Sequence, residues 1–297
     1  LQGCVANMYA GNPVCCLTNP FLGHEAEPLE KAEDPKKVMV IGGGVAGLSA
    51  AFIAKERGHE VTLYEAGDVL GGNMRLAAYP PGKGDITNMI RSYIHRCQKD
   101  GVKIVMNCEV TPELIKEEKP DSVIIATGSK TLILPIEGID NPAIIHGSDL
   151  LDGKRAAGKK VLVVGGGMVG CETAAFLGEQ EHDVTVIEFR DTVGADVIHE
   201  HRVYLMKDFE DYGIKEITGA KVCKFYEDGV EYETADGVRH ESRGYDSVIL
   251  SMGFRNYNPL EEKIKDLVPE THVIGDAIRA RRALDATKEA YEVASRI

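Results

Sequence analysis

A glycine-rich turn occurs twice in this chain, and it limits the folds that the sequence can adopt. The first copy, GGGVAG at residues 42–47, follows an apolar stretch at 38–41 and opens a run rich in Ala and Leu. The second copy, GGGMVG at residues 165–170, begins 123 residues later in the same context. A strand, a turn, a helix and a second strand in this order form a βαβ unit. The chain is therefore predicted to contain an internal duplication of that unit.

Each glycine of the turn has its own role in binding a dinucleotide. The first permits a tight turn, the second lets the backbone approach a pyrophosphate, and the third lets helix and strand pack closely. The helix that follows offers free N–H groups and the positive end of its dipole to the phosphates. The candidate positions are Gly42, Gly44, Ala46 and Gly47 in the first copy and Gly165, Gly167, Met168, Val169 and Gly170 in the second.

An acidic residue follows each glycine turn at the same spacing. Glu65 and Glu188 each lie 23 residues after the first glycine, where a carboxylate can accept both hydroxyls of a ribose. A turn that serves packing alone is the alternative, but strand, helix and acidic residue in register favour two dinucleotide sites. Glu188 would repel a 2′-phosphate and favours NADH, whereas Arg190 can pair with that phosphate and leaves NADPH open.

Composition excludes several other classes of protein. The chain is 43% hydrophobic and 27% charged, as globular proteins are, and no apolar run approaches the length of a membrane span. A net charge of −13 argues against a nucleic-acid partner. Seven cysteines without an export signal favour reduced thiols and a cytoplasmic location. We expect four of them to be core residues: Cys97, Cys108, Cys171 and Cys223.

With its two glycine turns the chain resembles the glutathione-reductase-like flavoproteins over residues 36–297. The resemblance includes Ala126-Thr127-Gly128, which ends a strand beside the flavin in that group, and Asp276, which binds the ribityl or pyrophosphate part of FAD. A capping aspartate is the alternative for Asp276. The resemblance implies FAD at the first turn and NAD(P)H at the second, and it adds Gly72 and Gly275 to the FAD side and Gly253 to the NAD(P)H side.

The implied fold is α/β, with two Rossmann-like domains, one inserted in the other. The FAD-binding domain is expected over residues 35–150 and 255–297, and the NAD(P)H-binding domain over 151–254. Disulfide reductases of this group carry a CxxxxC pair soon after the first acidic residue. The corresponding residues 71–83, GGNMRLAAYPPGK, contain no cysteine, so electrons that reach the flavin must leave by another route.

Cys4 and Cys16 resemble part of a cluster-binding segment in the iron–sulfur flavoenzymes related to 2,4-dienoyl-CoA reductase, 2-enoate reductase and trimethylamine dehydrogenase. In that family CxxCxxxC and a further Cys bind a [4Fe–4S] cluster between an FMN-binding TIM barrel and the FAD/NAD(P)H half. Cys4 and Cys16 take the third and fourth ligand positions, and Cys15 has no counterpart. Incidental thiols are the alternative, because two thiolates cannot hold this cluster alone.

The resemblance implies that residues 1–34 are a remnant of the cluster segment and a linker, and that the partner is an N-terminal FMN barrel absent from this sequence. The chain is then an FAD-dependent NADH oxidoreductase module of an enzyme that reduces α,β-unsaturated carbonyl compounds. A stand-alone NAD(P)H:acceptor reductase, a small subunit of a glutamate-synthase-like complex, and a structural module with ADP in the FAD site are the alternatives. No catalytic acid or base is predicted, because the cofactor performs the chemistry.

Overall fold

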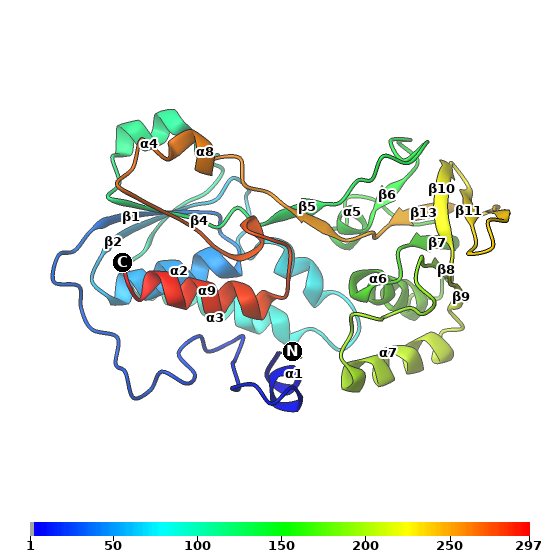
Figure 1. Cartoon of the computed structure of the whole chain (residues 1–297), viewed down its shortest axis with the longest axis horizontal. Coiled ribbons are helices and arrows are strands. Elements are labelled where there is room, and N and C mark those ends of the chain that lie inside the picture. The colour runs from blue at the N-terminus through cyan, green and yellow to red at the C-terminus, as the bar shows by residue number, and fades with distance from the viewer. Residues whose placement is uncertain (1–2) are drawn as a thin grey trace. The chain divides into compact units, whose positions relative to one another are not determined.

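The computed structural model describes residues 3–297, and the chain divides into two units (Figure 1). Among the described residues, the first unit comprises 3–78, Asp85–Lys130 and Arg255–Ile297, and the second comprises Tyr79–Gly84 and Thr131–Phe254. Each unit contains a parallel sheet with a hydrophobic core on both of its faces. The expected α/β class is observed, with the second unit inserted between segments of the first.

The sheet of the first unit has five parallel strands in the order β15-β4-β1-β2-β3. They are β1 (Lys37–Ile41), β2 (Glu60–Tyr64), β3 (Lys103–Val105), β4 (Ser122–Ile125) and β15 (Glu270–Val273). Because helices cover both faces, β1 is a continuous apolar run rather than an alternating one. Ile41 pairs with both Tyr64 and Ile125, so the strands end together at one edge of the sheet.

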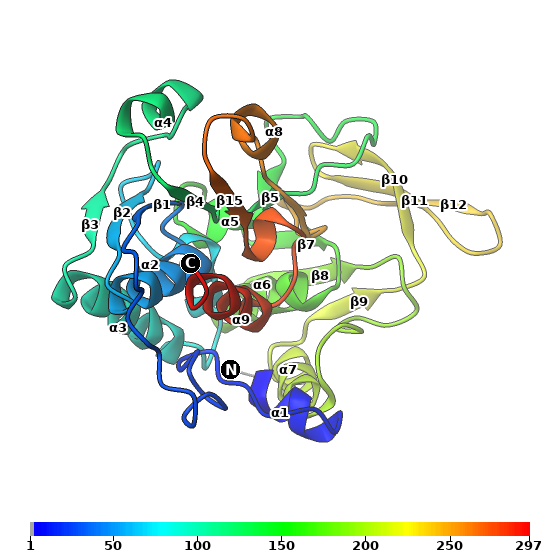
Figure 2. The same ribbon diagram turned by 60° about the vertical axis from the view of Figure 1, so that its left-hand side comes forward.

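Helices cover both faces of this sheet. Figures 1 and 2 show α2 (Val45–Glu56), α3 (Asp85–Lys99) and α9 (Ala283–Ala294) on one side, and α4 (Pro112–Glu118) and α8 (Glu261–Ile264) on the other. The segment of α2 is apolar almost all round because the helix packs on the sheet, on α3 and on α9. Two short 3-10 helices, η1 (Gly72–Ala78) and η2 (Gly275–Ala277), follow β2 and β15.

The segment before β1 packs on the helices of the first unit. It begins with α1 (Gly3–Tyr9) and continues without regular structure. The carbonyl of Leu17 accepts a hydrogen bond of 2.6 Å from the Tyr93 hydroxyl of α3. Phe21 packs edge-on against Tyr291 of α9, with ring centroids 5.6 Å apart. This segment is therefore attached to the α3 and α9 surface by buried contacts.

The second unit also has a five-stranded parallel sheet, but an antiparallel sheet rather than helices packs on one of its faces. Its parallel sheet has the order β6-β13-β7-β8-β9, built from β6 (Ile145–His146), β7 (Lys160–Val164), β8 (Asp183–Ile187), β9 (Lys215–Ile217) and β13 (Ser247–Leu250). Val161 and Val163 of β7 face a core with α6 (Met168–Glu179) and α7 (His199–Asp211). The alternate residues Leu162 and Val164 face a core that includes Phe225 and Val230.

Phe225 and Val230 belong to an antiparallel sheet of β10 (Lys221–Tyr226), β11 (Gly229–Glu233) and β12 (Arg239–Ser242). The short helix α5 (Gly147–Leu151) follows β6. Within the segment Thr131–Phe254 of the second unit, β6 joins β13 at the edge of the parallel sheet. The chain passes between the units through β5 (Ser129–Thr131) and β14 (Phe254–Asn256), which pair with each other.

Among residues 3–297, no helix combines the length and the apolar character that crossing a membrane requires.

Candidate dinucleotide sites

The first glycine turn connects β1 to α2 and leaves no room for side chains at two of its glycines. Gly42 has φ +110°, and a Cβ there would lie 2.3 Å from the Ala126 carbonyl oxygen. A Cβ on Gly47 would lie 1.9 Å from the Gly42 carbonyl oxygen. At Gly44, in contrast, the described residues place nothing within 4 Å of a Cβ. This opening at the N-terminus of α2 fits the close approach of a pyrophosphate.

Glu65 is held beside this turn by two backbone groups. Its Oε2 atom accepts a hydrogen bond from the N–H of Gly43, and its Oε1 atom accepts one from the N–H of Gly67, each at 2.7 Å. A carboxylate oxygen can accept a second bond, so both oxygens retain capacity for ribose hydroxyls. Backbone contacts within the unit therefore fix the orientation of this carboxylate.

The third part of this site forms where β4 and β15 end. Asp276 accepts hydrogen bonds from the Ser129 hydroxyl at 2.9 Å and from the Arg281 N–H at 3.0 Å. Tyr257 holds the end of β4: its carbonyl accepts a bond from the Thr127 hydroxyl, and its N–H donates to the Gly128 carbonyl at 2.9 Å.

All the predicted FAD-side positions therefore lie at the carboxyl edge of the first sheet or beside its glycine turn: Gly42, Gly44, Ala46, Gly47, Glu65, Gly72, Ala126, Thr127, Gly128, Gly275 and Asp276. Ligands bind at this edge in doubly wound α/β proteins. The chemistry of these groups fits FAD: helix N–H groups for its pyrophosphate and carboxylates for its hydroxyls.

The second glycine turn, between β7 and α6, reproduces the backbone of the first. Gly165 has φ +107°, and its Cβ would lie 2.4 Å from the Ser251 carbonyl oxygen. A Cβ on Gly170 would lie 1.8 Å from the Gly165 carbonyl oxygen. The two turns therefore require glycine for the same steric reasons.

Glu188 is also fixed by backbone N–H groups, from Gly166 at 2.5 Å and from Arg190 at 2.9 Å. The side chain of Arg190 is exposed. Gly253, with φ +101°, follows β13 at the same edge of the sheet. The structure thus brings the predicted NAD(P)H positions together at the carboxyl edge of the second sheet, and these groups fit a second dinucleotide.

One group that the sequence did not predict lies at this second turn. Asp196 accepts a hydrogen bond of 2.9 Å at Oδ1 from the N–H of Met168, the first residue of α6. A Cβ on Gly167 would lie 3.5 Å from Asp196 Oδ2. A carboxylate therefore lies where the second motif is expected to receive a phosphate.

A buried ion pair within the second unit also escaped prediction. Glu172 of α6 is 6% exposed and pairs with Lys83, and His201 Nε2 lies 3.6 Å from its Oε1 atom. A buried carboxylate is costly unless a cation compensates it. The available signal was a single charge in the apolar helix segment MVGCETAAF.

The cysteines fall into two groups. Cys97 and Cys171 are fully buried, and burial raises the pKa of each thiol to about 12. Cys108 and Cys223, also expected in the core, are half-buried, as are Cys4 and Cys15.

Cys16 is half-buried too, but its pKa is lowered. Burial by itself raises that pKa. Hydrogen bonds from the Thr18 hydroxyl and from the N–H groups of Thr18 and Asn19 together lower it by more, so the net shift is downward. Within residues 3–297 no cluster of three or more His, Cys, Asp or Glu side chains could hold a metal ion. The cysteines present therefore do not complete a four-ligand set.

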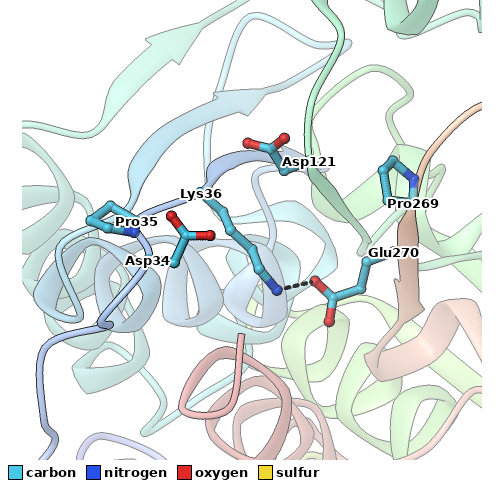
Figure 3. Close-up of a pocket in the computed structure, with 6 residues that line it drawn as sticks. All are labelled: Asp34, Pro35, Lys36, Asp121, Pro269 and Glu270. Atoms are coloured by element: carbon cyan, nitrogen blue, oxygen red, sulfur yellow. Dashed lines mark hydrogen bonds and ion pairs between the residues drawn. The ribbon is translucent and has the colours of Figure 1, made fainter.

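The hollow shown in Figure 3 lies at the opposite edge of the first sheet. It has a volume of about 530 Å³, and six residues line it: Asp34, Pro35, Lys36, Asp121, Pro269 and Glu270. These residues precede or begin β1, β4 and β15, so the hollow lies at the amino ends of parallel strands. It is therefore separate from the edge that carries the glycine turn.

Two parallel-sheet units, one inserted in the other and each with a glycine turn and a fixed carboxylate, define an oxidoreductase that binds two dinucleotides. The family model described as pyridine nucleotide-disulphide oxidoreductase matches residues 36–274. The chain belongs to this family, and it is an NAD(P)H-dependent flavin oxidoreductase. The predicted glutathione-reductase-like fold class is confirmed.

The chain is also similar over its whole length to larger reductases. It is 34% identical to a cinnamate reductase of Clostridium sporogenes over 100% of the chain and 44% of that protein. It is 34% identical to an NADH oxidase of Thermoanaerobacter brockii, over 99% of the chain and 46% of that protein. A solved 2-naphthoyl-CoA reductase complex superposes with a TM-score of 0.93 at 32% identity, over 100% of this chain and 45% of that one. The predicted resemblance to the FAD/NAD(P)H half of such enzymes is confirmed, and the chain spans about half the length of the relatives it matches.

Proposed function

We propose that this chain is the NADH-oxidising FAD module of a longer flavoenzyme. The observation that supports this most directly is the presence of two complete glycine turns, each with a carboxylate fixed by two backbone N–H groups. The electrons would pass to a [4Fe–4S] cluster and to FMN in a barrel outside these 297 residues. Relatives of roughly twice the length support a further domain in the whole protein.

In this proposal the first unit binds FAD and the second binds NADH. FAD, when bound, accepts an electron pair from NADH and releases electrons to the acceptor. The N-terminus of α2 would bind the FAD pyrophosphate, Glu65 its ribose and Asp276 its ribityl or pyrophosphate part. The N-terminus of α6, with Met168 and Val169, would bind the pyrophosphate of the nicotinamide nucleotide.

The proposed preference for NADH rests on Glu188. Its two oxygens are held by the N–H groups of Gly166 and Arg190, so the carboxylate cannot turn away without losing two hydrogen bonds. A 2′-phosphate at this position would meet a like charge. The exposed Arg190 side chain is the group that would reduce this discrimination in favour of NADPH.

Cys4 and Cys16 are proposed as two of the four cluster ligands. Cluster iron binds the thiolate, and the lowered pKa of Cys16 increases the thiolate fraction at neutral pH. The names of two similar proteins, cinnamate reductase and 2-naphthoyl-CoA reductase, support the reduction of an α,β-unsaturated carbonyl compound as the activity of the longer enzyme. A cytoplasmic location, which keeps thiols reduced, belongs to the same proposal.

The test is anaerobic reduction of the purified chain. After incubation with FAD and removal of unbound flavin, the protein should be yellow, and NADH should bleach its visible absorbance. A Gly44→Ala variant is the control, because a methyl group there has space in the folded chain but occupies the expected pyrophosphate position. It should fold and retain less flavin.

Two outcomes would contradict the proposal. A colourless protein that carries ADP would indicate the structural module instead. Rapid turnover of NADH with soluble acceptors, at a rate that added domains of the longer enzyme do not change, would indicate a stand-alone reductase.

A further inference from the structure

The loop after β8 is held against the second glycine turn by several hydrogen bonds. The N–H of Gly194 donates to the Gly166 carbonyl at 2.7 Å. Arg202 of α7 donates to the Thr192 hydroxyl at 2.8 Å and to the Val193 carbonyl at 3.1 Å. Residues 192–197, which lie between β8 and α7, are called the 192–197 loop below. The loop is thus held by α7 at Thr192 and Val193 and by the glycine turn at Gly194.

This loop places the Asp196 carboxylate on the N-terminus of α6. One oxygen accepts the N–H of Met168 at 2.9 Å, and the other lies 3.5 Å from the position of a Cβ on Gly167. The first N–H groups of a helix have no partner within the helix and attract anions. A carboxylate and a pyrophosphate would therefore compete for the same donors.

The first unit contains the same loop with a different side chain at this position. Gly71, 123 residues before Gly194, donates its N–H to the Gly43 carbonyl at 2.8 Å. Asn73, 123 residues before Asp196, donates from its amide to the Ser129 carbonyl at 3.2 Å. The described residues leave Gly44 open, whereas the carboxylate lies beside Gly167. The duplication thus pairs a neutral amide in one unit with an acid in the other.

We propose that Asp196 is a positioning residue that occupies the anion site of the second motif until the pyrophosphate of a nicotinamide nucleotide displaces it. This rests on the proposed function. The need to displace Asp196 weakens nucleotide binding at the second motif, whereas the equivalent position of the first unit holds the neutral Asn73. Asp196 thereby favours a nucleotide that exchanges at the second site, while the flavin is retained at the first.

The test measures equilibrium binding of two probes, ADP-ribose and adenosine, to the FAD-loaded chain by calorimetry. Asp196→Asn installs the residue of the first unit, and Asp196→Ala removes the competing acceptor altogether. The Kd of ADP-ribose is expected to fall about three- to tenfold in Asp196→Asn, the scale of a carboxylate at a helix N-terminus, and at least as far in Asp196→Ala. The Kd of adenosine, which has no phosphate, should stay unchanged.

The matched control is Asp191→Asn, which removes the same charge from an exposed residue three positions after Glu188. It should leave both Kd values unchanged. An unchanged or raised Kd for ADP-ribose in Asp196→Asn overturns the inference, as does an equal gain for adenosine or for Asp191→Asn. If neither the wild type nor the variants bind ADP-ribose, the proposed function fails and the inference fails with it.

Discussion

The two glycine turns have nearly the same backbone but different surroundings. In each, the first glycine has φ above +100° and the third would place a Cβ within 2 Å of the carbonyl oxygen of the first. In the first unit, the space beside Gly44 at the N-terminus of α2 is open. In the second unit, the Asp196 carboxylate lies at the N-terminus of α6. The buried Ser49 of α2 has Glu172 as its counterpart 123 residues later. The backbone contacts tolerate little change, whereas the surrounding side chains are free to differentiate the two sites.

The largest expected effect tests whether the two turns are equivalent. Gly47→Ala and Gly170→Ala each place a methyl group against a backbone carbonyl, so the helix must shift. Each should lower the free energy of unfolding by about 3 kcal/mol, measured by denaturant titration. Gly44→Ala, at φ −74° in open space, is the control and should change it by less than about 1 kcal/mol. Tolerance of only one of the first two substitutions would show that the turns differ.

A smaller effect separates the roles of the two carboxylates. Glu188→Gln replaces one charged acceptor by an amide, so NADH binding should weaken about tenfold, the scale of a charged hydrogen bond. NADPH binding should weaken less, because the repulsion of the 2′-phosphate is lost as well. The measurement is the Kd of each nucleotide. Glu65→Gln should instead weaken flavin retention and leave the ratio of the two Kd values unchanged; a shifted ratio would mean that the assignment of the units is wrong.

The smallest effect concerns a histidine pair at equivalent positions, 123 residues apart. His59 is fully buried and accepts the Lys36 N–H at Nδ1, whereas His182 Nδ1 lies 2.7 Å from the Gly158 carbonyl. Burial, with the nearby charges of Arg57 and Lys36, lowers the pKa of His59 below its ordinary 6.5. As the pH falls below 6.5, the unfolded chain takes up this proton first, so folding stability is lost.

His59→Gln should therefore reduce the loss of unfolding free energy on acidification, because its side chain has no proton to take up in this pH range. The measurement is denaturant unfolding at a series of pH values. The control is the same comparison above pH 6.5, where His59 is neutral in both states and the difference between the proteins should be constant. Parallel curves over the whole range would show that His59 does not contribute to the acid sensitivity.

Much of the site could be predicted because its determinants are local in the sequence. A glycine with positive φ, a helix start and a carboxylate after the next strand are set by neighbouring residues and fixed spacing. The position of β6 could not be predicted, because two strand residues carry little pattern and gain their structure only by pairing with β13. The burial of His59 and the Lys83–Glu172 pair depend on residues far away in the chain.

Local sequence is enough to specify two βαβ units, each with a dinucleotide turn and an acidic partner, because glycine sterics and strand–helix spacing permit little else. The side chain that faces each turn, in contrast, depends on how the rest of the chain folds. Asp196 lies 26 residues after Gly170 and reaches α6 because the 192–197 loop folds back over the turn, while Asn73 bonds to Ser129. The backbone of a turn is specified locally, but the charge that meets its helix end is supplied by a distant residue through the fold.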